Sequence, residues 1–172
     1  MLEWQQSKNY QERWDARDST MADNVIWLIN NFFPNDKVIV IAHNFHIAKY
    51  NKKQEVMGEV LKATYGDAMY SLGVFASKGS FNNNSGEKED MSVPENTRLD
   101  IKHIINALSG DVNFLDIPKT EGKFDRWLFS DIIVNDTFIT LSGDNEMNLS
   151  KHFDGLLLID EISEPEKLNN DN

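Results

Sequence analysis

The spacing of apolar residues predicts an amphipathic helix near the start of the chain and a buried strand soon after it. The helix is expected from about Tyr10 to Phe33, because apolar residues there recur at spacings of four, three and four. These residues are Met21, Val25, Leu28 and Phe32. The strand is expected over Val38–Ala42, five apolar residues of which four are β-branched, and it stops at two histidines, His43 and His46. Polar groups just beyond the carboxyl end of a buried strand lie where open α/β sheets hold their ligands and catalytic groups.

The rest of the pattern predicts alternating strands and helices. The elements expected are a helix near 54–64, a strand over 69–76, a helix over 97–108 closed by Gly110, extended segments at 112–115 and 132–141, and a buried strand over 153–160. Residues 79–96 are rich in Asn, Ser, Gly, Glu and Lys, which predicts a surface loop or flap. The sequence therefore predicts an α/β fold with a mixed, partly parallel sheet flanked by helices.

Length and charge limit the possible domain organisation and the possible classes of partner. With 172 residues and 40% hydrophobic content, the chain is expected to form one α/β domain over residues 1–162, followed by a mobile acidic tail over 163–172. A net charge of −11 opposes binding to phosphate backbones, so we expect no nucleic-acid partner. The start of the chain is too charged for a signal peptide, and the apolar runs are too short to span a membrane. We expect a cytoplasmic protein without a membrane partner.

Histidine chemistry is the first candidate function. The chain has no cysteine, which excludes disulfides and a thiolate nucleophile. An imidazole titrates near neutrality, so His43 and His46 could act as general base, general acid or oxyanion donor. The alternative, two buried structural histidines, carries about equal weight. Asn44 lies between them and could orient either ring through its amide.

The predicted first helix offers a second set of polar candidates. Arg17 and Asn24 lie within about 60° of the apolar positions Met21 and Leu28 around that helix. A buried guanidinium needs a carboxylate or a polar cavity. Arg17 could therefore hold an anionic or carbonyl group, or it could sit at the edge of the stripe with its charge in water.

Other kinds of site carry less weight. A metal held by the two histidines with Asp23, Glu55 or Glu59 is a minor alternative, since the spacing differs from the zinc-protease helix motif. Nucleophile-elbow, dinucleotide and P-loop motifs are absent from the sequence. His103 and His152 are interpreted as structural or exposed. We therefore expect neither a metal nor another cofactor.

Several spaced segments together resemble the erythromycin esterase family, which includes proteins named for succinoglycan biosynthesis. The segments are Arg17-Asp18-x-x-Met21-Ala22-x-Asn24-x-x-Trp27-Leu28, Ala42-His43-Asn44-x-His46, Met57-Gly58, Tyr70-Ser71-Leu72-Gly73 and Phe153-Asp154-Gly155-Leu156-Leu157-Leu158-Ile159. The resemblance implies a hydrolase in which histidine activates water for attack on a small-molecule ester or lactone, and for a macrolide lactone it implies antibiotic resistance. On that analogy His43 and His46 are catalytic, and Arg17, Asn24 and Asn44 bind substrate.

One departure from the family bears on activity. Members are about twice as long, and their presumed water-activating histidine lies in a segment Gly-Glu-x-x-His-Gly, which this chain does not contain. The chain resembles a C-terminal part of the fold. Two hypotheses follow: a hydrolase whose base comes from an N-terminal partner segment or another chain, or an inactive truncated domain that keeps the fold and a ligand cleft. Both predict little activity for the isolated chain and an exposed apolar surface that favours self-association.

Overall fold

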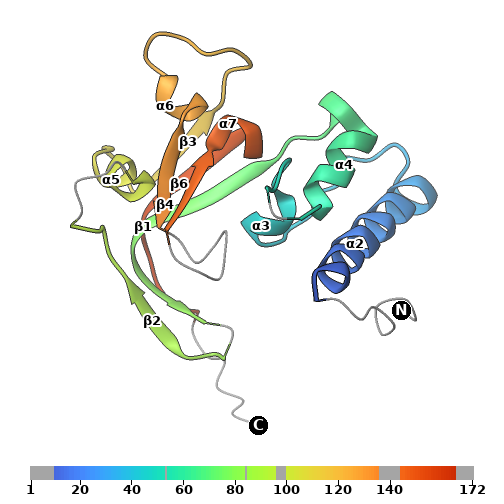
Figure 1. Ribbon diagram of the computed structural model, residues 1–172, viewed down its shortest axis with the longest axis horizontal. Coiled ribbons are helices and arrows are strands. Elements are labelled where there is room, and N and C mark those ends of the chain that lie inside the picture. Colours follow the sequence, from blue (N-terminus) through green and yellow to red (C-terminus); the bar gives the residue numbers. More distant parts are fainter. Residues whose placement is uncertain (1–9, 53, 84, 96–99, 136–143, 166–172) are drawn as a thin grey trace.

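The structure is a computed structural model, which describes residues 10–52, 54–83, 85–95, 100–135 and 144–165 (Figure 1). Its elements, in chain order, are α2 (Tyr10–Phe32), α3 (Asn44–Ile47), α4 (Met57–Tyr65), the 3-10 turn η1 (Gly66–Ala68), β1 (Leu72–Asn82), β2 (Lys88–Met91), α5 (Ile101–Asn106), β3 (Val112–Asp116), α6 (Arg126–Phe129), β4 (Asp131–Asn135), β5 (Asp144–Asn148), α7 (Leu149–His152) and β6 (Gly155–Ile162).

The main sheet has four strands in the order β2-β1-β6-β3. β1 and β6 run parallel, with register from Leu72 opposite Gly155 to Gly79 opposite Ile162. β2 and β3 are antiparallel to their neighbours, and β4 and β5 form a separate two-stranded sheet. The predicted mixed, partly parallel sheet flanked by helices is thus confirmed, and so are the predicted first helix and closing strand.

One face of the main sheet carries the core. The side chains of Phe75, Leu156 and Leu158 are almost wholly buried on this face. They pack against Ile101 and Ile105 of α5, Phe153, and the inner residues of β4 and β5. This cluster is the larger of two apolar cores and accounts for the apolar run that predicted β6.

The opposite face of the sheet is apolar and partly exposed. The strand register places seven apolar side chains on it, which we call the outer face: Leu72, Val74, Ala76, Val112, Phe114, Leu157 and Ile159. Val112 is 59% exposed and Phe114 is 61% exposed. Contiguous apolar surface of this kind is typical of an interaction site.

A smaller core joins α2 to α4 beside the sheet (Figure 1). Ala22 of α2 packs with Met57 and Leu61 of α4, all of them buried. Gly58 lets α3 approach α4 closely, because a Cβ at this position would overlap the backbone of Ile47 and Ala48. α3 therefore lies between the two cores, with α4 against one of its sides and β1 against another.

The prediction of a buried strand over Val38–Ala42 is wrong for this chain. The segment forms no strand pairing within the described residues, and Ile39 and Ile41 are 85% and 93% exposed. β-branched residues favour extended backbone, but burial requires neighbouring strands and a covering layer. The described part of the chain supplies neither to this segment.

The prediction of a loop over residues 79–96 is also wrong in part. β1 continues to Asn82 and pairs with β2 in an antiparallel ribbon, from Gly79 opposite Met91 to Asn82 opposite Lys88. Polar residues can form such a ribbon because its hydrogen bonds come from the backbone.

Other boundaries differ by a few residues. The helix predicted over 97–108 spans Ile101–Asn106, and the strand predicted over 132–141 spans Asp131–Asn135. Residues 96–99, 136–143 and the tail from 166 onward lie outside the described residues. The short elements η1, α3, α6, β5 and α7 were not predicted. Among the described helices, none combines the length and apolar character needed to cross a bilayer.

Candidate functional site

Both candidate histidines belong to the short helix α3. His43 is its N-cap residue, and its Nδ1 accepts a hydrogen bond from the backbone N–H of Phe45 (3.3 Å). His46 lies within the helix, and the centroids of the two rings are 6.5 Å apart. The structure thus places the two rings side by side, with His43 exposed and His46 partly buried.

His46 is held between two consecutive residues of α2. Its Nδ1 lies 2.8 Å from Asp18 Oδ2, and its Nε2 lies 2.5 Å from Arg17 Nη2. Asp18 is fully buried, and the same Oδ2 accepts the backbone N–H of Met57 at the start of α4 (3.0 Å). A carboxylate at a helix N-terminus is stabilised by the positive end of the helix dipole. Arg17, His46 and Asp18 therefore form one hydrogen-bonded group that links α2, α3 and α4.

The electrostatic surroundings favour the neutral form of His43. Although the residue is exposed as a whole, neighbouring protein atoms partly desolvate its ring, and this effect, followed by the nearby His46, lowers the pKa of His43 below its ordinary value. Both effects disfavour the charged imidazolium form of this ring. Its Nδ1 is the acceptor for the Phe45 N–H, so the proton lies on Nε2.

Asn44 fixes α3 to the edge of the sheet. Its side-chain Nδ2 donates to the carbonyl oxygen of Val74 (2.6 Å), and its Oδ1 accepts the Val74 N–H (3.0 Å). The Asn44 amide therefore takes the place of a neighbouring strand at this point of β1. Both functional groups of the buried side chain are directed to backbone, so the structure places Asn44 as a link between α3 and β1.

Two more contacts fasten the end of α3. Ser71 Oγ donates to the carbonyl of Ile47 (2.7 Å), and the Ser71 N–H donates to Asp154 Oδ2 (2.9 Å). Lys49 Nζ lies 2.6 Å from Asp154 Oδ1. These polar contacts hold the histidine-bearing helix at the start of β1 and β6.

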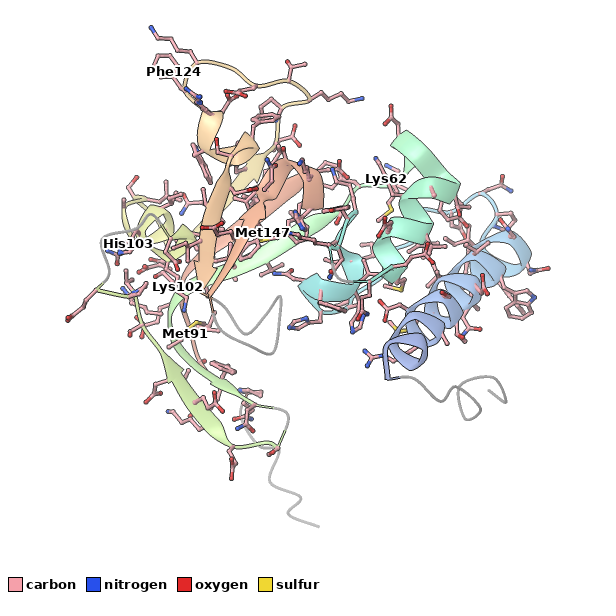
Figure 2. The ribbon with its side chains drawn as sticks, viewed as in Figure 1. Lys62, Met91, Lys102, His103, Phe124 and Met147 are labelled. Atoms are coloured by element: carbon pink, nitrogen blue, oxygen red, sulfur yellow. The ribbon has the colours of Figure 1, made fainter. Side chains whose placement is uncertain are left out.

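The other candidates lie apart from this group. Asn24 is exposed on α2, two turns beyond Arg17, and no contact among the described residues joins it to the histidines. Figure 2 labels His103 on α5, where its Nδ1 accepts the Asp100 N–H and its Nε2 lies 2.9 Å from the carbonyl of Pro94. His152 lies 2.6 Å from the carbonyl of Asn148, and burial lowers the pKa of its ring. Both histidines have structural contacts, as expected.

Asp18 is the main site residue that the sequence did not single out. It lies three residues before Met21 and therefore in phase with the apolar stripe of α2. The feature of the sequence that could have identified Asp18 as a site residue is a carboxylate at a core-facing position next to Arg17. Within the part of the chain that the structure describes, no three His, Asp or Glu side chains gather as metal ligands would.

Comparison with known proteins decides the family. A sequence model of the family described as erythromycin esterase matches residues 1–162. The chain belongs to the erythromycin esterase family. It is 24% identical over 160 residues to a protein named putative hydrolase YbfO from Bacillus subtilis (strain 168), covering 86% of this chain and 35% of that protein. It is 40% identical over 70 residues to an erythromycin esterase type II from Escherichia coli, covering 37% of this chain and 17% of the relative.

Solved structures share the fold of this chain, among them a mutant of the erythromycin esterase EreC, with a TM-score of 0.56 at 17% identity, covering 86% of this chain and 37% of that one. The crystal structure of a succinoglycan biosynthesis protein superimposes with a TM-score of 0.76 at 19% identity, covering 94% of this chain and 42% of that one. The chain thus spans less than half the length of these relatives.

Proposed function

We propose that this erythromycin esterase family chain carries one side of a hydrolase site, at which water attacks a carboxylic ester or lactone with the help of His43 and His46. The observation that carries the proposal is the hydrogen-bonded group of Arg17, His46 and buried Asp18, with the His43 ring beside it. Carbonyl chemistry needs such preorganised donors where negative charge develops. The names of the relatives, a putative hydrolase and an erythromycin esterase, support this reaction class.

The proposed substrate is a small-molecule ester or lactone. A macrolide lactone would give the protein a part in antibiotic resistance, and we propose a cytoplasmic location for it. Arg17 and His43 are the proposed contacts to the carbonyl group, and Asn44 has a positioning role through Val74. Asn24 is proposed as a more distant substrate contact.

We further propose that a polypeptide segment corresponding to the unmatched part of the relatives completes the site and supplies the proton acceptor. The relatives are more than twice as long as the matched region, and the chain exposes apolar residues on Val38–Ala42 and on the outer face. Val38–Ala42 leads directly into His43, so a strand paired with it would lie next to the site. Without that segment, the same surface favours self-association.

The reaction class can be tested by measuring the affinity of the chain for two probes, which does not require the chain to turn over a substrate. The probes are p-nitrophenyl methylphosphonate, a tetrahedral anion that resembles the intermediate of ester hydrolysis, and the neutral ketone p-nitroacetophenone. We expect the phosphonate to bind the chain about tenfold or more tightly, because hydrolase sites favour the transition state over the ground state. Planar p-nitrobenzoate is the control for charge alone. Equal binding of phosphonate and ketone, or tighter binding of the benzoate, would rule out an esterase-type site.

A further inference from the structure

The hydrogen bonds of His46 fix which of its ring nitrogens carries the proton. The guanidinium of Arg17 has only donors, so His46 Nε2 must be an acceptor in the 2.5 Å contact. The carboxylate of Asp18 is an acceptor, so His46 Nδ1 carries the proton in the 2.8 Å contact. His46 therefore donates through Nδ1 and accepts through Nε2, and both nitrogens are engaged.

This arrangement leaves His46 without a nitrogen that can take a proton from water unless a contact breaks. Asp18 is fully buried and is also fixed by the Met57 N–H, so it anchors the chain of hydrogen bonds. These hydrogen bonds run in series from Asp18 through His46 to the guanidinium of Arg17. They fix the direction in which that guanidinium points.

His43 also presents a donor. Its Nδ1 accepts the Phe45 N–H, which leaves the proton on Nε2. The ring centroid of His43 lies 6.5 Å from that of His46, the ring that holds Arg17. Arg17 and the His43 ring, which both lie beside His46, are thus both hydrogen-bond donors.

From this geometry we infer that Arg17 and His43 bind the carbonyl oxygen as it becomes an oxyanion, while His46 and Asp18 are positioning residues that act through Arg17. The inference rests on the proposed function and deepens it. As water bonds to the carbonyl carbon, the π electron pair of the carbonyl moves to its oxygen, where Arg17 and His43 Nε2–H donate. The proton of the water passes to a histidine or carboxylate base on the completing segment. That proton goes to the leaving alkoxide when the tetrahedral intermediate collapses and its C–O bond breaks.

The first test reads the tautomers directly in the unmodified chain. ¹⁵N-detected NMR of the histidine rings at a pH where they are neutral is expected to show the proton of His46 on Nδ1 and that of His43 on Nε2. The measurement needs no substrate, so it does not depend on whether the chain hydrolyses esters. A proton on Nε2 of neutral His46, or on Nδ1 of neutral His43, would overturn the inference.

The second test separates contact from positioning, again with p-nitrophenyl methylphosphonate. Arg17→Ala is expected to weaken binding about tenfold or more, since charge-assisted hydrogen bonds are lost. His46→Ala is expected to weaken it less. His46→Gln should restore part of the loss, because a glutamine can accept from Arg17 and donate to Asp18.

The matched control is Arg126→Ala, which removes an exposed arginine paired with Glu121 on α6 and should leave binding unchanged. Equal binding by the wild type and Arg17→Ala would refute the contact to Arg17. Equal losses in His46→Ala and His46→Gln would refute the positioning role. If the tautomers are as expected but the phosphonate does not bind better than the ketone, the proposed function fails while the hydrogen-bond assignment stands.

Discussion

Removing the side chain of Asn44 should destabilise the domain at the point where α3 meets β1. Asn44→Ala deletes two hydrogen bonds, of 2.6 and 3.0 Å, to the backbone of Val74. The net value of a hydrogen bond is about 0.5–1.5 kcal/mol, so the expected loss in the free energy of unfolding is about 1–3 kcal/mol. For a domain of this size each kcal/mol corresponds to about 2–4 °C in Tm.

The assay is urea unfolding of the wild type and two variants. Asn31→Ala is the matched control, because Asn31 on α2 makes one exposed side-chain bond to the carbonyl of Trp27 (2.8 Å). We expect its change to stay within about 0.5 kcal/mol. Hydrogen exchange adds a local measurement, in which the Val74 amide should exchange faster in Asn44→Ala. If Asn44→Ala costs no more than Asn31→Ala and leaves Val74 exchange unchanged, Asn44 does not replace a strand at this edge.

Three further predictions concern activity, association and pH. The chain alone should hydrolyse p-nitrophenyl acetate only slowly, because both histidines use their acceptor nitrogens within the fold; robust turnover that His43→Ala abolishes would contradict this. Light scattering should detect self-association that the double variant Ile39→Lys and Ile41→Lys reduces and the control Phe124→Lys, at an equally exposed loop position, does not; a monomer at high concentration would count against it. Stability should fall as pH drops below about 6.5, because the pKa values of His43 and His152 are lowered in the fold and the unfolded chain takes up protons first. Urea unfolding at several pH values checks this, and a weaker slope is expected in His43→Asn, which keeps an N-cap residue; an unchanged slope there would exclude a contribution from His43.

The elements predicted correctly are those whose pattern is satisfied close to the residues themselves. The stripe on α2 includes Met21 and Val25, which pack on α4, and the continuous apolar run of β6 includes Leu156 and Leu158, which are buried in the core. Val38–Ala42 has an equally strong apolar pattern, yet it is exposed, because burial depends on a neighbour that the described chain does not supply. An apolar pattern indicates that a segment tends to be buried. Whether the segment is buried depends on the neighbouring elements that the fold places against it.

The site was predicted in part, and the missing part concerns the roles of the residues. The two histidines could be found because they follow a strand-like run, and Arg17 because it borders the stripe of α2. The roles depend on hydrogen bonds between residues 28 and 29 positions apart, which no local pattern encodes. Asn44 illustrates the same limit, since its amide is directed to the backbone of Val74, 30 residues away.

The position of Val38–Ala42 connects the exposed surface to the site. The chain leaves α2 at Phe32 and enters α3 at Asn44, so this segment joins the helix that carries Arg17 to the helix that carries His46. The Arg17–His46 contact also joins these two helices, directly through their side chains. A strand that pairs with Val38–Ala42 would fix the conformation of the segment between the two helices. It would therefore limit the range of distances between Arg17 and His46. The completing segment that we propose would then have two effects, because it would supply the base and would also hold Arg17 and His43 in the geometry that an oxyanion requires. A segment that pairs with Val38–Ala42 but lacks the base should therefore tighten binding of the phosphonate without restoring turnover.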